Sequence, residues 1–208
     1  MSVIRLLVKR PKYIFRSAFC RFALRMIHGV HVGKNFYCED FPRLQIRGSA
    51  RNIRIGDNVK FLGQVDIRNR ENGRVEIGNN VTIEGGCRFV SARDGRITIG
   101  EGTAVGADAV WNGGGDIVVG NKCLFGVRSS INANEHLMKR HRFIRDQGFV
   151  HAPVVIENDC WFGVNVAINK GCVIREGSVI GANAVVVRDT ERYSVSVGIP
   201  AKQIAERE

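Results

Sequence analysis

Large hydrophobic residues recur at every sixth position through most of the chain. In the clearest stretch, steps of six reach only large apolar side chains, namely Ile156, Phe162, Ile168, Ile174, Ile180 and Val186. The position four residues after each of the first five holds a small or β-branched side chain, namely Cys160, Val166, Cys172, Ser178 and Ala184. Neither a helix nor an amphipathic strand has this period. It predicts a triangular coil of three short strands, whose equivalent residues stack along one axis.

A longer period accompanies the short one in the first half of the chain. Ile55, Ile77 and Ile99 lie 22 residues apart and open the similar phrases IGDNV, IGNNV and IGEGT. Three six-residue strands account for 18 of the 22 residues. We expect the other four to form outward bulges near residues 70–73 and 93–95. From Ile156 to Ile174 the spacing is 18, which predicts a plain coil there.

The repeat breaks between Ile131 and Ile156, where the chain reads NANEHLMKRHRFIRDQGFVHAPVV. This break predicts a long loop over residues 132–153 that protrudes from an otherwise regular solenoid. Long loops on a regular scaffold commonly carry function. We therefore expect the chemistry of the protein to involve this segment.

The amino-terminal segment has a different pattern. Residues 11–29 are predicted to be helical, because Pro11 suits a first helical turn and Gly29 a carboxy-terminal cap. An apolar stripe at helical spacing comprises Phe15, Phe19, Phe22 and Met26. This stripe either packs on the solenoid or lies on an anionic membrane. The predicted organisation is a basic amphipathic segment (1–30), a β-helix (31–198) and a carboxy-terminal tail (199–208).

The excess positive charge of the chain is concentrated at its amino-terminal end. The formal net charge is +11, and residues 1–38 contain eight basic and no acidic side chains. These basic residues interrupt every apolar run, which excludes a signal-peptide core or a membrane-spanning helix there. We expect a cytoplasmic protein with reduced thiols, and no nucleic-acid partner, because no recognised motif accompanies the basic segment. The small inward positions hold cysteines, which we interpret as buried core thiols: Cys87, Cys123, Cys160 and Cys172.

Residues 50–207 resemble the hexapeptide-repeat acyltransferases, especially the galactoside and maltose O-acetyltransferase group and its surface-polysaccharide relatives. The phrases that carry the resemblance are INANEH (131–136), VVIENDCWFGVNVAINKGCVI (154–174), GSVIGANAVVVRD (177–189) and GIPAKQI (198–204). The resemblance implies an all-β, left-handed parallel β-helix. It also implies a homotrimer with active sites in clefts between neighbouring subunits.

The same resemblance implies roles for particular residues. His136 corresponds to the catalytic base, and Trp161 to an aromatic residue that lines the same site. The acetyl donor is acetyl-CoA, and its predicted contacts are Gly163, Val164, Ala182, Val187, Arg188 and Lys202. Two positions depart from the family pattern: Val164 stands where many sugar acetyltransferases have Ser, and the acceptor-binding residues have only one candidate counterpart, Asn112. The implied reaction is O-acetylation of a sugar or of a capsule, exopolysaccharide or O-antigen.

Acetyl transfer to a hydroxyl requires a base, and an imidazole that titrates near neutrality is suited to that task. In this reading His136 takes the hydroxyl proton while the oxygen attacks the thioester carbonyl, and then returns it to the departing thiolate. Glu135 or a backbone carbonyl orients the imidazole. A backbone N–H stabilises the oxyanion. The basic cluster Lys139–Arg145 is either a solvated loop face or a site of attraction for coenzyme phosphates or an acidic glycan.

Other functions are compatible with the same repeat. An N-acyltransferase for amino sugars differs only in the acceptor nucleophile. A non-catalytic β-helix scaffold would not need the His136 loop. A γ-class carbonic anhydrase binds zinc through three His, and His136 and His141 have the spacing of two of them. The coil before the loop supplies no third His, so we expect no metal.

Overall fold

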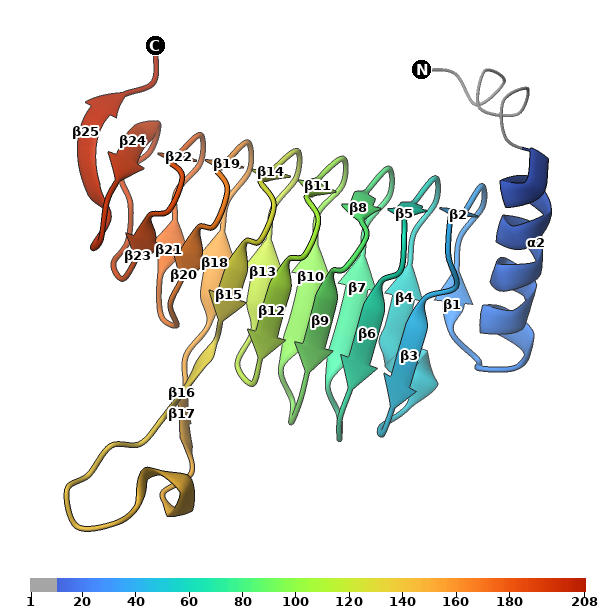
Figure 1. The fold of residues 1–208 in the computed structure, drawn as a ribbon, viewed down its shortest axis with the longest axis horizontal. Helices are drawn as coiled ribbons and strands as arrows, with labels where there is room; N and C mark the ends of the chain where they lie inside the picture. The colour runs from blue at the N-terminus through green and yellow to red at the C-terminus, as the bar shows by residue number, and fades with distance from the viewer. Residues whose placement is uncertain (1–10) are drawn as a thin grey trace.

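The computed structural model describes residues 11–208, so the part of the predicted amino-terminal segment that covers residues 1–10 lies outside the described residues. The chain winds into a parallel, left-handed β-helix with one helix at its amino-terminal end and one hairpin projecting from its side (Figure 1). The predicted fold class is thereby confirmed. None of the helices within residues 11–208 has the length and apolar character that crossing a membrane requires.

Three flat sheets form the faces of the prism. Sheet A comprises β1 (His31–Val32), β4 (Ile53–Ile55), β7 (Arg74–Ile77), β10 (Arg96–Ile99), β13 (Ile117–Val119), β18 (Val154–Ile156) and β21 (Val173–Ile174). Sheet B comprises β2 (Tyr37–Cys38), β5 (Lys60–Leu62), β8 (Thr82–Glu84), β11 (Ala104–Val105), β14 (Leu124–Phe125), β19 (Trp161–Phe162), β22 (Val179–Ile180), β24 (Ser194–Val197) and β25 (Lys202–Glu206). Sheet C comprises β3 (Arg43–Ile46), β6 (Asp66–Asn69), β9 (Arg88–Ser91), β12 (Val110–Gly113), β15 (Ser130–Asn132), β20 (Ala167–Ile168) and β23 (Val185–Val186).

The stacking of equivalent residues follows both sequence periods. Ile55 pairs with Ile77, and Ile77 pairs with Ile99, across strands of sheet A. Ile156 pairs with Ile174 in the same sheet, where one turn takes 18 residues. The four extra residues of the longer turns lie between β6 and β7 and between β9 and β10, where Glu71 and Arg93 have positive φ. These are the predicted outward bulges.

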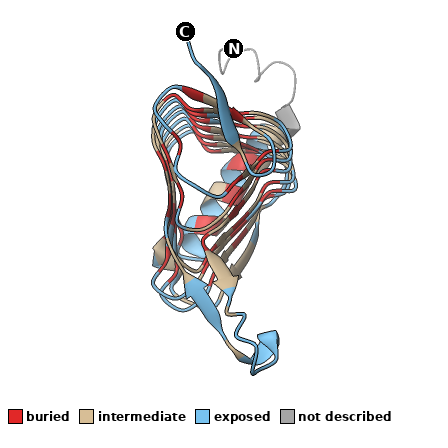
Figure 2. Ribbon diagram, turned by 90° about the vertical axis from the view of Figure 1, so that its left-hand side faces the viewer, coloured by how far each residue is buried: buried red, intermediate tan, exposed pale blue. Residues whose placement is uncertain are grey.

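The interior is filled by the residues at the inward positions of the repeat. Figure 2, which looks along the prism, shows that buried positions line its inside and exposed positions its corners. An aromatic row runs through the centre, formed by Phe89, Trp111, Phe125 and Phe162. All six cysteines are buried as free thiols, which agrees with the interpretation of the four inward ones. Burial raises the pKa of the Cys87 thiol to about 11.

A glycine at one corner of the prism explains the recurrent Ile-Gly phrase. The turns after β4, β7 and β10 stack directly on one another, and their backbones approach closely. A Cβ atom added at Gly56 would lie 2.8 Å from the carbonyl carbon of Gly78, a contact that real Cβ atoms do not make. Any side chain at Gly56 would therefore force the stacked turns apart.

The helix α2 (Pro11–Met26) packs across the amino-terminal end of the prism against β1 and β2. Its buried residues are Ser17, Cys20 and Leu24. The Ser17 hydroxyl accepts a hydrogen bond from the Cys38 N–H at 2.9 Å, and Arg21 Nε donates to the Gly33 carbonyl at 2.6 Å. The predicted apolar stripe lies on a different side of the helix and remains exposed, namely Phe15, Phe19, Phe22 and Met26.

The insert forms an antiparallel hairpin of β16 (Asn134–His136) and β17 (Phe149–His151), with a tip that includes the 3-10 turn η2 (Ile144–Asp146). A second 3-10 turn, η1 (Ala50–Asn52), precedes β4. The hairpin leaves the prism after β15 of sheet C and returns at β18 of sheet A. It therefore projects from the corner between these two sheets (Figure 1).

Candidate active site

His136 is the last residue of β16, and the hairpin fixes its backbone. It lies opposite Phe149 in the antiparallel register, and the next N–H, that of Leu137, donates to the Gly148 carbonyl at 3.1 Å. The imidazole is exposed and lies against the Phe149 ring, with ring centroids 4.2 Å apart. The predicted base is thus held on a supported strand rather than on a free loop, with a face open to substrate.

The register of the hairpin sorts its side chains into two faces. Asn134 is opposite His151 and His136 is opposite Phe149, so these four residues share one face. Glu135 lies on the other face, where its carboxylate accepts from Lys170 Nζ at 2.9 Å. The structure therefore pairs the Glu135 carboxylate with Lys170, and the aromatic ring of Phe149 contacts the imidazole of His136.

A cleft of about 520 Å³ lies between this hairpin face and sheet C. Phe149 lines it beside the His136 imidazole, and so does Asn112, the candidate acceptor-binding residue. The Asn112 side-chain amide donates to Asn132 Oδ1 at 3.1 Å, which orients it. The lining residues are Arg68, Arg70, Glu71, Arg88, Val90, Ala92, Arg93, Asn112, Gly113, Gly114, Asn134, Phe149 and His151.

Trp161 lies elsewhere on the chain. It belongs to β19 in sheet B, and its side chain is 55% exposed. It lines a different cleft of about 260 Å³ together with Leu124, Val179 and Arg207. A single chain therefore does not bring His136 and Trp161 into one cleft.

Three of the predicted coenzyme contacts do come together. Gly163, Val164 and Ala182 lie at the corner between sheets B and C, on successive turns of the prism. A Cβ atom on Gly163 would lie 2.6 Å from the Ala182 nitrogen, and the Asn183 N–H donates to the Val164 carbonyl at 2.9 Å. Val164 and Ala182 are both exposed, so this corner presents a small apolar surface.

The other predicted coenzyme contacts lie at the carboxy-terminal end of the prism. Lys202 opens β25 and pairs with Val197 of β24, which in turn lies against the corner at Gly181. Val187 and Arg188 follow β23 directly, and their side chains are exposed together with that of Lys202. An apolar surface with two cations near its end suits the extended apolar arm and the phosphates of an acyl coenzyme A.

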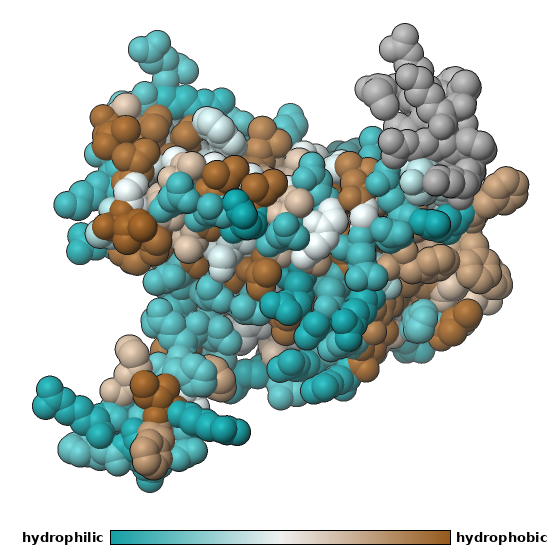
Figure 3. All heavy atoms as spheres, viewed as in Figure 1, coloured by the Kyte–Doolittle hydropathy of each residue, from teal (hydrophilic) through white to brown (hydrophobic). Residues whose placement is uncertain are grey.

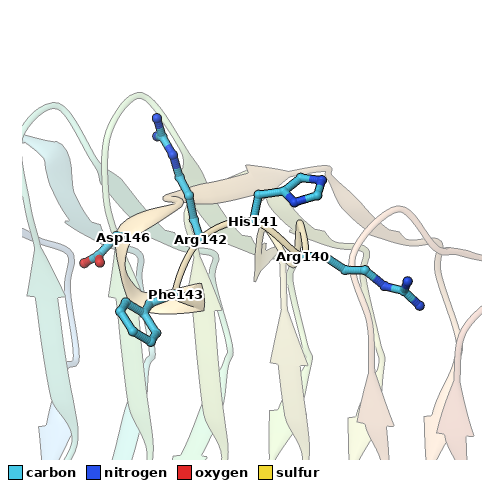
Figure 4. A pocket seen from close by; sticks show the side chains of 5 residues that line it. All are labelled: Arg140, His141, Arg142, Phe143 and Asp146. Atoms are coloured by element: carbon cyan, nitrogen blue, oxygen red, sulfur yellow. The ribbon is translucent and has the colours of Figure 1, made fainter.

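The tip of the hairpin carries the basic cluster at residues 139–145. In Figure 4 the side chains of Arg140, Arg142 and Phe143 spread away from one another into solvent around a shallow hollow. His141 is exposed at this tip, whereas His136 lies at the base of the hairpin. Within residues 11–208, no three His, Cys, Asp or Glu side chains come together as a metal-binding group.

Two features of the cleft were not singled out from the sequence. Phe149 and His151 belong to a strand that no repeat marks, and their place depends on the hairpin register. Four arginines of the lining, Arg68, Arg70, Arg88 and Arg93, belong to β6, β9 and the bulges that follow them. The signal for all four was available, because Arg68 and Arg88 occupy outward positions of the repeat, and Arg70 and Arg93 lie in the predicted bulges.

Comparison with known proteins relates part of the repeat to a protein family. Residues 153–188 match the model for the bacterial transferase hexapeptide (six repeats). A "Probable acetyltransferase" of Mycobacterium tuberculosis is 37% identical over 105 residues, 50% of this chain and 35% of the relative. The galactoside O-acetyltransferase of Escherichia coli is 31% identical over 91 residues, 43% of this chain and 44% of the relative. The chain thus spans about a third of the length of the first curated relatives that it matches.

Solved structures share the fold. The polySia-specific acetyltransferase NeuO superposes with a TM-score of 0.65 over 86% of this chain and 78% of its own, at 22% identity. An N-acyltransferase of Bacillus cereus superposes with a TM-score of 0.57 over 86% and 84%, at 20% identity. A hexapeptide-repeat acetyltransferase of Vibrio cholerae, solved with acetyl coenzyme A, is 31% identical with a TM-score of 0.52 over 54% and 61%.

Proposed function

Because the chain belongs to the hexapeptide-repeat acyltransferase family, we propose that it moves an acetyl group from acetyl-CoA to a hydroxyl of a sugar or surface polysaccharide, with His136 as the general base. The observation that carries this proposal is the placement of His136. Its imidazole is exposed on a supported strand, beside a cleft large enough for a sugar. The chemistry follows from the residues around it.

The imidazole takes the proton of the acceptor hydroxyl while the oxygen attacks the thioester carbonyl of acetyl-CoA. The carbon–sulfur bond then breaks, and the same imidazole returns the proton to the departing thiolate. Positioned base catalysis of this kind contributes about 10²–10⁴-fold. The Phe149 ring supports one side of the imidazole and leaves the other accessible.

The exposed corner at Gly163, Val164 and Ala182 is proposed to hold the pantetheine arm of acetyl-CoA. Lys202 and Arg188 would then lie near its phosphates. Support for this placement comes from the small exposed side chains of the corner and from the two cations at the same end of the prism. Val164 replaces the hydroxyl side chain of many relatives by an apolar one, which an apolar arm tolerates.

We infer that the protein acts as a homotrimer. In one chain Trp161 lines a cleft on sheet B, whereas His136 contacts Phe149, which lines the separate cleft beside sheet C. A trimer would allow Trp161 of the partner subunit to complete the site around His136. The 55% exposure of this large indole on a single chain supports such an interface.

Acetyl-CoA turnover with a panel of neutral and acidic sugars and glycans tests the proposal. The wild-type protein should release coenzyme A thiol only when an acceptor is present. His136→Ala should lose at least about a hundredfold in kcat. His141→Ala, a change of an exposed histidine at the hairpin tip, is the matched control and should retain the wild-type rate. Equal activity of His136→Ala and wild type would contradict the assignment.

Mass spectrometry of the product separates the two acceptor classes. An acetyl ester is cleaved by mild alkali, whereas an acetamide survives it. Alkali-labile product supports the O-acetyltransferase, and alkali-stable product on an amino sugar supports the N-acyltransferase instead. A trimer that binds neither acetyl-CoA nor sugar would indicate a scaffold.

We further propose that α2 lies on an anionic membrane surface, which would place a cytoplasmic enzyme near lipid-linked glycan precursors. The packed side of α2 is already occupied, and its apolar side stays exposed; among the described residues its one ring contact is that of Phe19 with Phe41. Figure 3 shows hydrophobic residues gathered over this helix. Arg25 is also exposed on the helix. Phe15→Ser/Phe19→Ser should abolish sedimentation with anionic liposomes at low salt, and sedimentation equal to wild type would contradict the proposal.

A further inference from the structure

Four arginines gather on sheet C beside the His136 hairpin. Arg68 lies on β6 and Arg88 on β9, and Arg70 and Arg93 lie in the bulges that follow these strands. All four line the 520 Å³ cleft, and only Arg68 is half-buried, whereas the other three are exposed. The cleft therefore concentrates positive charge next to the proposed catalytic base.

Most of this charge is not neutralised by the protein. Arg68 forms a two-pronged ion pair with Asp66, with Nη2 to Oδ2 at 2.5 Å, and Glu71 is the one acidic residue of the lining. Within residues 11–208, Arg70, Arg88 and Arg93 form no ion pair with any carboxylate. Three guanidinium groups against one carboxylate leave the cleft cationic, which is typical of a site for an anion.

The part of the lining nearer the hairpin carries groups suited to a sugar. Asn112 and Asn134 present side-chain amides, and Phe149 presents an aromatic ring. His151 Nε2 lies 3.4 Å from Arg93 Nη1, and its Nδ1 is buried without a hydrogen-bond partner among the described residues. The amides can bind sugar hydroxyls, whereas the arginines would take a charged substituent.

The position of the four arginines bears on which substrate supplies the anion, the acceptor or the coenzyme. The hairpin leaves the prism between β15 and β18, and the four arginines lie on turns before it. The surface proposed to hold acetyl-CoA, around Gly163 and Ala182, lies on turns after it. Within one chain, an anion in the cationic cleft is therefore separated from the surface proposed for the coenzyme, which favours the acceptor as the source of the anion.

We propose that the cleft binds the carboxylate of an acidic acceptor glycan, with Arg88 and Arg93 as its principal partners and Asn112 at a neighbouring hydroxyl. This inference rests on the proposed acetyltransferase function. Guanidinium groups pair with carboxylates in a planar, two-pronged geometry, so the cleft selects a uronic or sialic acid over a neutral sugar of similar shape.

Binding and turnover are measured with two probes, oligosaccharides of glucuronic acid and of sialic acid, each compared with its carboxyl-reduced form. The wild-type protein should bind at least one acidic probe about tenfold more tightly than the reduced form, and the preference should fall with added salt. Arg88→Gln/Arg93→Gln should remove this preference and leave KM for acetyl-CoA unchanged. The matched control, Arg54→Gln/Arg74→Gln, changes two exposed arginines of sheet A and should behave as wild type.

The outcomes separate the two proposals. Carboxylate-dependent binding without any acetyl transfer would support the cleft assignment and count against the proposed function. Acetyl transfer to neutral glycans, with no difference between acidic and reduced probes, would support the function and overturn the cleft assignment. A rise in KM for acetyl-CoA in Arg88→Gln/Arg93→Gln, with the preference between probes retained, would assign the arginines to coenzyme phosphates and overturn it as well.

Discussion

The imidazole of His136 and the phenyl ring of Phe149 lie directly across the hairpin from each other, with centroids 4.2 Å apart and planes 39° apart. The two residues are separated by the whole hairpin tip in the sequence. Their contact restricts the rotation of the imidazole, which the backbone of β16 alone leaves free. Phe149 is therefore a positioning residue for the proposed base.

Phe149→Leu should lower kcat by about tenfold and change KM for either substrate little, because an aromatic pair contributes about 0.5–1.5 kcal/mol. Steady-state kinetics with the preferred acceptor measures both constants. Phe143→Leu, at the exposed hairpin tip, is the control and should keep the wild-type kcat. A rise in KM with kcat unchanged would show that Phe149 contacts the sugar rather than orienting the imidazole.

Mixed trimers test the proposed division of the site between subunits. His136→Ala and Trp161→Ala should each be inactive, but trimers reassembled from equal amounts of both should recover about a quarter of the wild-type activity. Recovery is expected because one site in four then combines an intact His136 with an intact Trp161 of the partner subunit. Absence of recovery in trimers shown to be mixed would place both residues in one subunit's site.

Glu157 should make the stability of the fold depend on pH. Its carboxylate accepts the Glu176 N–H at 2.9 Å, and this bond, together with Arg192 and Arg175, lowers the pKa of Glu157 below its ordinary value of 4.5. A lowered pKa in the folded state stabilises the fold above the ordinary value, and the stabilisation is lost as the pH falls through the lowered one.

Glu157→Gln should therefore reduce the free energy of unfolding by about 1 kcal/mol at pH 7. The difference from wild type should shrink as the pH is lowered below 4.5. Urea denaturation at a series of pH values measures it, with Glu191→Gln, an exposed residue, as the control. A difference that does not vary with pH would show that the charge of Glu157 does not stabilise the fold.

The core thiols should resist modification until the protein unfolds. Burial raises the pKa of Cys87 and Cys172 to about 11, so both are protonated as well as inaccessible near neutrality. Labelling with a thiol-specific reagent at pH 7.5 should modify none of the described cysteines in the native protein and all of them in urea. Rapid labelling of Cys87 in native protein would contradict its burial.

The coil could be predicted because each inward position of the repeat must hold an apolar residue. Ile55, Ile77 and Ile99 stack as their spacing implies, and the Ile-Gly phrases lie where the turns pack backbone against backbone. The repeat is also interrupted where the hairpin leaves the prism. The same pattern therefore placed His136 outside the regular coil.

The contents of the cleft and the orientation of α2 could not be predicted in the same way. Phe149 reaches His136 through an antiparallel register that no periodicity encodes. Two sets of residues recur at helical spacing along α2. One set is Phe15, Phe19 and Phe22, and the other is the smaller Ser17, Cys20 and Leu24. The smaller set faces the prism because Ser17 bonds to the Cys38 backbone and small side chains allow close approach.

The two ends of the prism differ from every turn between them. At one end α2 covers β1 and β2, and at the other β25 runs antiparallel to β24 and presents exposed polar residues such as Lys202 and Glu206. A stack of parallel strands without such ends would offer bare edges to further copies of itself and grow into a fibre. Truncation of either terminus thus threatens solubility before it threatens the fold of the middle turns.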